Sequence, residues 1–245
     1  MPIVLIPARY ASTRFPGKPL SEVKIGVPLI ELVYKNVAKA GFETVVVTDD
    51  ERIEAAVKKF QGQVCRVDDN VPSGSERIAL AFERFFKTAD LVINVQGDEP
   101  LLDPNDLKKL ADAHLKSSFE MMTMIKPQKN NREDFLDKNK VKAVWNKNNG
   151  ECFYFSRAPI PFPRDEMSEL HWHLHLGVYS FKPQSLIKFV KAAPSFYEET
   201  EKLEQLRALG LGFKIGAIEV HHQSLGVDTP DDLKKLQGVL YGKTS

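Results

Sequence analysis

The sequence predicts an α/β fold with a mixed, mainly parallel central sheet and helices on both faces. Short apolar runs of β-type residues alternate with segments of helical periodicity through the first half of the chain. The links between them are short, as in parallel sheets wound through helices. The chain has 245 residues, of which 42% are hydrophobic, so it can bury a sizeable core.

The first half reads as four strands separated by three helices. The first expected helix carries apolar residues at helical spacing, and Gly41 ends it. The expected strands cover 3–6, 44–47, 64–67 and 91–95, and the expected helices cover 29–40, 51–60 and 75–87. This alternation is the pattern of a parallel sheet.

The second half is expected to mix strands and helices less regularly. Asn146–Gly150 (N-K-N-N-G) is a candidate hairpin turn. The expected strands cover 121–125, 141–145, 152–155, 174–181 and 214–220, and the expected helices cover 107–116, 184–191, 202–209 and 230–240. We expect residues 1–115 and 116–245 to be two halves of a single domain.

Composition excludes several classes of protein. A formal net charge of +1 does not favour a nucleic-acid-binding protein. Cys65 and Cys152 are too few for a disulfide framework or a zinc cluster. The sequence shows no signal peptide and no apolar segment long enough to span a membrane. A soluble cytoplasmic protein without a membrane partner is therefore expected.

A basic loop follows the first strand. Arg9, Arg14 and Lys18 alternate there with small residues and turn formers. Open α/β sheets bind anions at the carboxyl ends of strands, and three cations suit a polyphosphate. The loop is not a Walker A motif, because Pro19 follows Gly17-Lys18 where a hydroxyl is required. The loop predicts a nucleoside triphosphate site, the alternative being a solvated basic surface.

Two aspartates are candidate metal ligands. Asp98 follows an apolar strand and Gly97, which places its carboxylate at the same sheet edge. Asp228 precedes the last expected helix, where Thr229 and Pro230 already mark the start. A carboxylate beside a triphosphate is a common ligand of Mg²⁺. For Asp98 the alternative is a turn or capping aspartate, and Glu99 could be the ligand in its place. Asp228 is not needed for capping, which requires only one of the neighbouring side chains.

Small residues precede the third expected helix. Ser73 and Gly74 can offer backbone N–H groups and a hydroxyl to a base or a phosphate. Ser75 is the expected N-cap of the helix, and this role is compatible with ligand contacts made by the backbone.

The second half carries polar residues in two patterns. His171, His173 and His175 alternate on an expected strand, which suggests either a zinc site or, more commonly, an exposed polar face. His175 and Tyr179 should line one face of that strand.

Glu204 and Gln205 lie on an expected helix and could hydrogen-bond a polyhydroxylated ligand. Spacing alone favours instead a solvated helix face with Glu201–Gln205 and Glu204–Arg207 pairs.

Taken together, these segments resemble the 3-deoxy-D-manno-octulosonate (Kdo) cytidylyltransferases, or CMP-Kdo synthetases. The motifs follow the family's order along nearly the whole chain. They are I-P-A-R (6–9), S-T-R-F-P-G-K-P-L (12–20), T-D-D (48–50), S-G-S-E-R (73–77), N-V-Q-G-D-E-P (94–100), Y-F-S-R (154–157), H-L-G-V-Y (175–179), L-E-Q-L-R (203–207) and V-D-T-P (227–230).

The resemblance implies Mg²⁺-dependent transfer of CMP from CTP to the anomeric hydroxyl of Kdo, with release of pyrophosphate, for lipopolysaccharide biosynthesis. It implies a homodimer with the Rossmann-like nucleotide-diphospho-sugar transferase fold, a nucleotide-binding first half and a sugar-binding and dimerisation second half. The implied site residues are the following: Arg9, Arg14 and Lys18 for the triphosphate; Asp98 and Asp228 for Mg²⁺; Pro7, Ala8, Ser73 and Gly74 for the cytidine part; Gln96, Arg157, His175, Tyr179, Glu204 and Gln205 for the sugar acid.

The sequence leaves alternatives open. Val71 stands where the family usually has His, and Ser75 stands where Thr is usual. A related branch of the family uses 8-amino-Kdo. Two other functions are possible. The first is another nucleotidyltransferase on the same fold; one that acts on a sugar phosphate would need more cations on the sugar side than Arg157 and Arg164. The second is a non-enzymatic nucleotide-binding regulator, which would not need both metal-binding aspartates.

Overall fold

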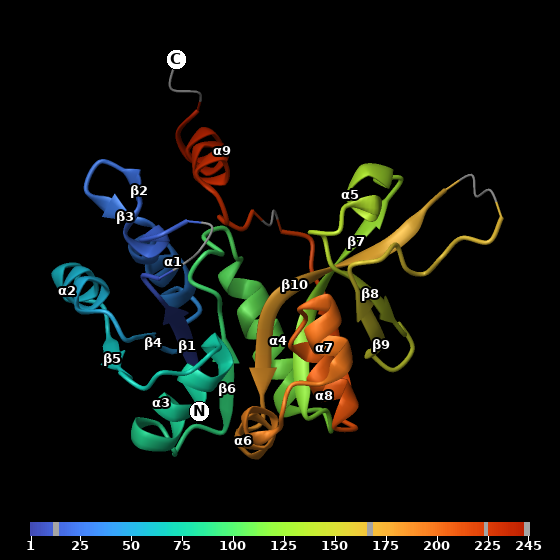
Figure 1. Cartoon of the computed structure of the whole chain (residues 1–245), viewed down its shortest axis with the longest axis horizontal. Helices are drawn as coiled ribbons and strands as arrows, with labels where there is room; N and C mark the ends of the chain where they lie inside the picture. Colours follow the sequence, from blue (N-terminus) through green and yellow to red (C-terminus); the bar gives the residue numbers. More distant parts are fainter. Residues whose placement is uncertain (12–14, 166–168, 223–224, 243–245) are drawn as a thin grey trace. The chain divides into compact units, whose positions relative to one another are not determined.

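The computed structural model describes residues 1–11, 15–165, 169–222 and 225–242. The chain divides into two compact units (Figure 1), the first made of 1–108 and 222–245 and the second of 109–221. The expectation of a single domain stays a prediction. Within the described residues, no helix has the length and apolar character needed to cross a membrane.

The first unit is built on parallel strands. They lie in the order β5 (Val64–Arg66), β4 (Glu43–Thr48), β1 (Pro2–Ala8) and β6 (Leu91–Asn94). All side chains from Ile3 to Ala8 are buried. Because successive side chains of a strand point to opposite faces, this burial means that both faces of β1 are covered. The carboxyl ends of β1, β4 and β6 therefore share one edge, where the sequence places its candidate site residues.

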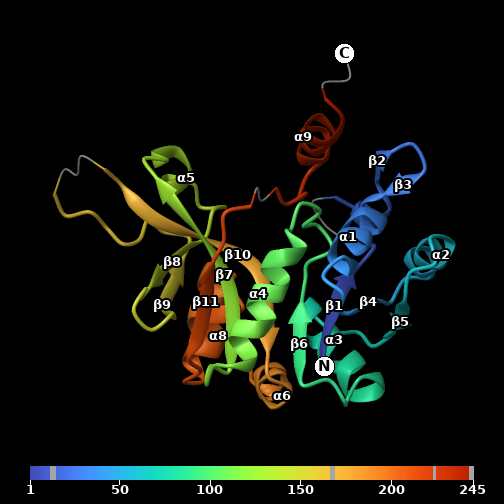
Figure 2. The same ribbon diagram turned by 180° about the vertical axis from the view of Figure 1, so that it is seen from behind.

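Helices flank these strands. They are α1 (Leu29–Ala38), α2 (Glu51–Lys59), α3 (Gly74–Phe85) and α9 (Pro230–Tyr241), with α4 (Pro104–Leu115) leading into the second unit. The sequence predicts each of them to within a few residues. It misses a short hairpin of β2 (Glu22–Lys24) and β3 (Val27–Pro28) and the 3₁₀ turn at Lys18–Leu20. Figure 2 shows α9 beside this hairpin, where the Gln237 side chain donates to the carbonyl of Glu22 over 3.2 Å.

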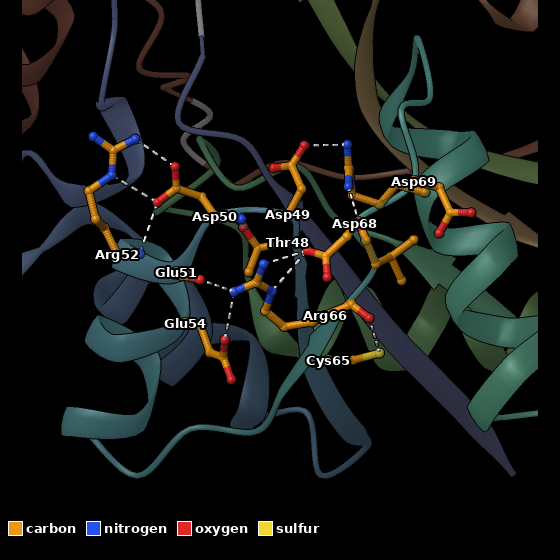
Figure 3. Close-up of polar contacts among 12 residues, drawn as sticks. Thr48, Asp49, Asp50, Glu51, Arg52, Glu54, Cys65, Arg66, Asp68 and Asp69 are labelled. Carbon is orange, nitrogen blue, oxygen red and sulfur yellow. Dashed lines mark hydrogen bonds and ion pairs between the residues drawn. The ribbon is translucent and has the colours of Figure 1, made fainter.

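Charged side chains fix the loops after β4 and β5 (Figure 3). Asp50 caps α2 by accepting from the backbone N–H of Arg52 at 2.9 Å, and its carboxylate also pairs with the Arg52 guanidinium at 2.6 Å. Arg66 on β5 pairs with Glu54 of α2 at 3.3 Å and with Asp68 at 2.5 Å. These contacts hold the ends of two neighbouring strands in place.

The second unit is mostly antiparallel. Its strands are β7 (Met121–Lys129), β8 (Lys142–Trp145), β9 (Glu151–Ser156), β10 (His171–Phe181) and β11 (Ile215–Glu219). They lie in the order β10-β7-β11-β9-β8, and β8 also pairs with β10, so the pairings close into a ring. Only β7 and β11 are parallel among these described pairs. With the parallel first unit, this confirms the predicted mixed α/β class.

The predicted turn between β8 and β9 is confirmed. The Gly150 N–H donates to the carbonyl of Asn146 over 2.8 Å, and Gly150 adopts φ 77°. Glycine tolerates this left-handed conformation, which closes the hairpin.

One predicted helix is wrong at its start. Residues 202–204 are not helical. They follow α7 (Phe196–Glu201), and only the later part of the expected segment is helical, in α8 (Gln205–Gly210). The break occurs because Lys202 adopts a left-handed conformation with φ 53°. The second unit also contains α5 (Arg132–Leu136), which the sequence does not predict, and α6 (Pro183–Lys191).

Candidate active site

The segments that follow β1 and β6 touch each other. The two strands pair in parallel, and the Val95 N–H donates to the carbonyl of Leu5 over 3.2 Å. A Cβ on Gly97 would lie 3.3 Å from the carbonyl oxygen of Pro7. Glycine is therefore needed for the two backbones to approach, and it places Asp98 beside the loop after β1.

That loop folds back on itself before Lys18. The Gly17 N–H donates to the carbonyl of Tyr10 over 2.9 Å, and Gly17 adopts φ 70°. A Cβ there would come within 3.2 Å of the Tyr10 ring. Arg14, the second predicted cation of the loop, lies outside the described residues.

The two predicted metal ligands converge on one ammonium group. The Nζ atom of Lys18 lies 2.5 Å from Oδ2 of Asp98 and 3.4 Å from Oδ1 of Asp228. The Lys18 side chain is 16% exposed, so the contacts form at a partly desolvated position. Residues from three distant parts of the sequence thus form one charged cluster.

The segment before α9 positions Asp228. The Val227 N–H donates to the carbonyl of Asp98 over 3.0 Å, which ties the two aspartates together through the backbone. Thr229 caps α9 and forms a capping box with Asp232. The sequence argument that Asp228 is not needed for capping is therefore confirmed.

Arg9 holds the loop that precedes α3. Its Nη2 donates to the carbonyl of Val71 over 2.6 Å and its Nη1 to that of Pro72 over 2.9 Å. Its Nε is buried and has no hydrogen-bond partner in the described part of the chain. A cation predicted to bind phosphate thus also shapes the neighbouring loop.

The start of α3 packs against the end of β1. A Cβ on Gly74 would lie 3.1 Å from Cγ of Pro7, so the predicted cytidine-contacting pairs Pro7-Ala8 and Ser73-Gly74 lie together. The expectation that Ser75 caps α3 is wrong. Ser73 is the N-cap. Its Oγ accepts from the Glu76 N–H at 3.1 Å, and the Ser73 N–H donates to the Glu76 carboxylate in return.

Arg77 is a buried cation that sequence reasoning missed as a functional group. It is 1% exposed, pairs with Asp49 at 2.6 Å and donates to the carbonyl of Val67. Burial lowers the pKa of the Arg77 guanidinium, while Asp49 opposes this shift. The sequence does contain a hint of this burial, because Arg77 directly precedes the buried apolar residues of α3 that begin at Ile78. Arg77 joins the end of β4 to the segment leading to the Ser73 loop.

In the second unit, His175 is buried and neutral. Burial lowers its pKa to about 3. Its Nε2 lies 3.1 Å from Oγ1 of Thr123, which donates its own hydroxyl proton to the carbonyls of Leu176 and Val178. The tautomer with the ring proton on Nε2 fits this geometry, because Thr123 Oγ1 then accepts from His175 while donating to a carbonyl, and it leaves Nδ1 as an acceptor.

Tyr179 lies beside His175 as predicted, with ring centroids 5.5 Å apart. A bulge lies between Leu176 and Tyr179, and His175 and Tyr179 face Ile125 and Thr123 of β7. The Tyr179 hydroxyl donates to Oε1 of Gln205 over 2.9 Å, and burial raises the pKa of that hydroxyl. Gln205 is 1% exposed, and its Nε2 has no partner within the described residues.

The expected solvated helix face around Gln205 is wrong. Gln205 and Arg207 are buried, and Glu204 directly precedes α8. Arg207 pairs with Glu198 of α7 through two hydrogen bonds of 2.6 and 2.8 Å. Helical spacing could not reveal this pair, because a short non-helical segment separates the two helices.

Arg157 follows directly after β9, as predicted. Its guanidinium donates to the carbonyls of Glu201 at 2.6 Å, Lys138 at 2.9 Å and Lys202 at 3.3 Å. Among the described residues, no carboxylate forms an ion pair with the guanidinium. The Glu201 carboxylate accepts from the Arg157 backbone N–H at 2.6 Å. The guanidinium charge therefore stays available to an anion.

Two further predictions are placed as follows. Gln96 is half-buried and lies in the first unit just after β6. The alternating histidines do not form a metal cluster, because the described residues contain no group of three or more His, Cys, Asp or Glu side chains that could hold a metal ion.

Comparison with known proteins identifies similar cytidylyltransferases. A family model described as cytidylyltransferase matches residues 3–215. A 3-deoxy-manno-octulosonate cytidylyltransferase of Geobacter metallireducens is 41% identical, with 95% of this chain and 94% of the relative covered. A protein of the same name from Photobacterium profundum is 40% identical, with coverage of 97% and 98%.

A solved structure agrees with these relatives. It is described as CMP:2-keto-3-deoxy-manno-octonic acid synthetase complexed with CTP, and it is 34% identical to this chain. It superposes with a TM-score of 0.89 over 98% of both chains, which confirms the predicted nucleotide-diphospho-sugar transferase fold. The chain therefore belongs to the family of 3-deoxy-manno-octulosonate cytidylyltransferases.

Proposed function

We propose that this protein transfers CMP from CTP to the anomeric hydroxyl of Kdo, with release of pyrophosphate, as a step of lipopolysaccharide biosynthesis. The observation that carries the proposal is the cluster in which Lys18 contacts both Asp98 and Asp228 at the edge of a parallel sheet. A phosphate-binding cation and two carboxylates in one place suit a metal–triphosphate complex. Membership in the cytidylyltransferase family supports the choice of nucleotide and sugar.

The donor set fits Mg²⁺. Two carboxylates are what this ion takes from a protein when phosphate oxygens and waters complete its shell. The position already accommodates positive charge, because the Lys18 ammonium lies against both carboxylates. When bound, Mg²⁺ would neutralise charge on the triphosphate and lower the pKa of a hydroxyl in contact with it.

On the nucleotide side, the protein's own residues bind and orient CTP. Arg9, Lys18 and Arg14 supply cations for the triphosphate. The end of β1 at Pro7-Ala8 and the start of α3 at Ser73-Gly74 supply closely packed backbone for the cytidine part. The buried Nε of Arg9 is a donor that still lacks an acceptor among the described residues, which is consistent with an anionic ligand.

On the sugar side, each predicted residue offers a suitable group. Nδ1 of His175 can accept a hydrogen bond from a sugar hydroxyl, and Nε2 of Gln205 can donate one. Arg157 supplies a cation for the sugar carboxylate, and Glu204 and Gln96 supply further polar groups. With a pKa of about 3, His175 is too weak a base to take the attacking hydroxyl's proton at neutral pH, so its role is orientation.

The reaction exchanges one phosphorus–oxygen bond for another. The anomeric oxygen bonds to the α-phosphorus, the bond to pyrophosphate breaks, and the hydroxyl proton is released. Because charge develops on the leaving pyrophosphate, the cations of the loop after β1 stabilise the transition state.

We further propose a cytoplasmic homodimer. The second unit exposes large aromatic side chains that a partner subunit could cover: Phe153, Tyr154, Phe162, Phe196 and Tyr197. Both cysteines are free thiols, as expected in a reducing compartment. Sedimentation at micromolar concentration tests the dimer, and a monomer would contradict it.

The activity is tested by pyrophosphate release from CTP and Mg²⁺ with Kdo, 8-amino-Kdo and other sugar acids. Asp228→Asn should lose at least a hundredfold in kcat, because one of two metal ligands is neutralised. The matched control is Asp231→Asn, three residues away, which removes an exposed carboxylate that pairs only with Lys234 at 3.1 Å in the described contacts. Normal turnover by Asp228→Asn would contradict the two-carboxylate site. A preference for 8-amino-Kdo would replace Kdo as the proposed substrate.

A further inference from the structure

Lys142 is a buried cation that the proposed reaction does not yet use. Its side chain is 0% exposed, although lysine is almost never fully buried without a partner. Its Nζ donates to three carbonyls, those of Asp137 at 2.9 Å, Lys140 at 2.6 Å and Arg157 at 2.6 Å. An ammonium has three N–H donors, so all of them are satisfied by carbonyl oxygens.

These three carbonyls belong to two segments. Asp137 and Lys140 lie in the connection between α5 and β8, and Arg157 follows the last residue of β9. Lys142 itself lies on β8, in register with Ser156, next to Arg157. Its ammonium therefore joins the connection to the end of β9.

The same connection also holds the Arg157 side chain. The Lys138 carbonyl, between the two carbonyls bound by Lys142, accepts from Nη1 of Arg157 at 2.9 Å. Lys142 thus fixes both the backbone of Arg157 and one of the acceptors that orient its guanidinium. Glu201 fixes Arg157 from the other side through its backbone carbonyl and its carboxylate.

The guanidinium is oriented but not neutralised. Three of its five N–H groups donate to carbonyls, one from each nitrogen. The other two, on Nη1 and Nη2, have no partner in the described part of the chain. An arginine held in this way presents a fork that matches a carboxylate.

The burial of the Lys142 ammonium is not explained by a gain in folding stability. Burial lowers the pKa of Lys142; the Asp137 carboxylate opposes this shift, Arg157 adds to it, and Glu201 opposes it. A buried ammonium costs free energy that an apolar side chain would not. What the arrangement supplies is a fixed backbone and a fixed guanidinium orientation for Arg157.

We propose that Lys142 is a positioning residue for the sugar acid, acting through Arg157. This inference rests on the proposed function. The test is steady-state kinetics of pyrophosphate release by Lys142→Met, which keeps an unbranched side chain of similar length without the charge. The KM for the sugar acid should rise about tenfold or more, the KM for CTP should change less than twofold, and kcat should fall less than the sugar kcat/KM.

The matched control is Lys147→Met in the turn between β8 and β9, where the lysine side chain is exposed and contacts no part of the Arg157 network in the described residues. It should keep the wild-type KM for both substrates. A similar loss in both variants would show a general effect of charge near the site and would overturn a specific role for Lys142.

A double-mutant cycle separates positioning from mere structural support. If Lys142 acts through Arg157, then Lys142→Met/Arg157→Lys should lose little more in sugar kcat/KM than Arg157→Lys alone. Additive losses would overturn the proposal. Should Lys142→Met fail to bind CTP or to melt cooperatively, Lys142→Gln, which keeps two N–H donors without the charge, replaces it in the same cycle.

The outcomes also separate this inference from the proposed function. A wild-type protein that releases no pyrophosphate with any sugar acid would overturn the function itself. An active wild type whose Lys142→Met variant keeps the sugar KM would overturn only the role of Lys142.

Discussion

Two residues assigned to the substrates keep a buried nitrogen atom without a hydrogen-bond partner in the described part of the chain. They are Arg9, through Nε, and Gln205, through Nε2. A buried donor left unsatisfied costs about 1–3 kcal/mol, so native proteins rarely retain one without a reason. Both residues are predicted from sequence motifs, but their missing acceptors could be seen only in three dimensions.

Lys18 should compete with a divalent cation for the two aspartates. Its ammonium lies 2.5 Å from Asp98 and 3.4 Å from Asp228, where it supplies part of the charge that a metal would bring. Lys18→Met should therefore raise the Mn²⁺ affinity of the nucleotide-free protein by about tenfold, the equivalent of roughly 1.4 kcal/mol. Electron paramagnetic resonance of free Mn²⁺ measures this directly.

The control is Lys35→Met, which removes an exposed ammonium paired with Glu31 at 2.6 Å. It should leave Mn²⁺ affinity unchanged. Equal or weaker Mn²⁺ binding by Lys18→Met would show that the lysine and the metal do not share the carboxylates.

His175 should make the protein sensitive to acid. Its pKa is lowered from 6.5 to about 3 in the folded chain, so the unfolded chain binds the extra proton between these values. This contribution to stability is complete above pH 6.5 and is lost as the pH falls. Between pH 7.5 and pH 5 the loss should be about 2 kcal/mol, since each unit below 6.5 contributes about 1.4 kcal/mol.

Urea unfolding at the two pH values measures this loss. His175→Gln should lose about 2 kcal/mol less than the wild type over the same interval. An identical pH dependence in His175→Gln and the wild type would be inconsistent with a neutral buried His175.

At the scale of elements, long periodic segments are predictable and short ones are not. The helices of the first unit follow from apolar spacing and terminal glycines, as in α1. By contrast, α5 has 5 residues and α7 has 6, too few for a periodic signal. The break at Lys202 depends on a left-handed conformation that lysine seldom adopts, so no propensity argument could place it.

The pairing of α7 with α8 should be a strong local determinant of stability. Glu198 and Arg207 are 10% and 5% exposed and share two short hydrogen bonds. Glu198→Gln should lower the free energy of unfolding by about 3–5 kcal/mol, because a buried guanidinium loses its carboxylate. Urea denaturation measures it.

The surface variant Lys234→Met provides the comparison, since its pair with Asp231 is exposed. That change should cost at most about 1 kcal/mol. A cost for Glu198→Gln within this surface range would mean that the two helices are held chiefly by apolar packing.

At the scale of the whole molecule, the sequence predicts the fold class and the sheet edge that carries the charged cluster. The order of motifs along the chain identifies the family. It does not predict the ring of strand pairings in the second unit, because β8 meets β10 through contacts that no local pattern encodes. The division into halves at residue 115 does not place residues from 222 onward with the first unit, although the joint role expected for Asp98 and Asp228 brings them together; these residues return to the first unit.

This return predicts the effect of ending the chain at residue 221. The shortened protein should lose pyrophosphate release, because Asp228 is removed, and should keep the strands of the second unit, because all of them precede residue 222. Methyl NMR signals of Met121, Met122 and Met124 on β7 report on those strands. Collapse of these signals would show that the second unit depends on the removed segment.

The distance in sequence between Lys18 and Asp228 also has a consequence in time. The two residues are 210 positions apart. At about 5–20 residues per second on the ribosome, roughly 10–40 seconds separate their synthesis. During that interval the nascent chain carries Lys18 without Asp228. Under the proposed roles of these residues, the site is complete only once Asp228 has been synthesised, so catalysis should begin only near the end of translation.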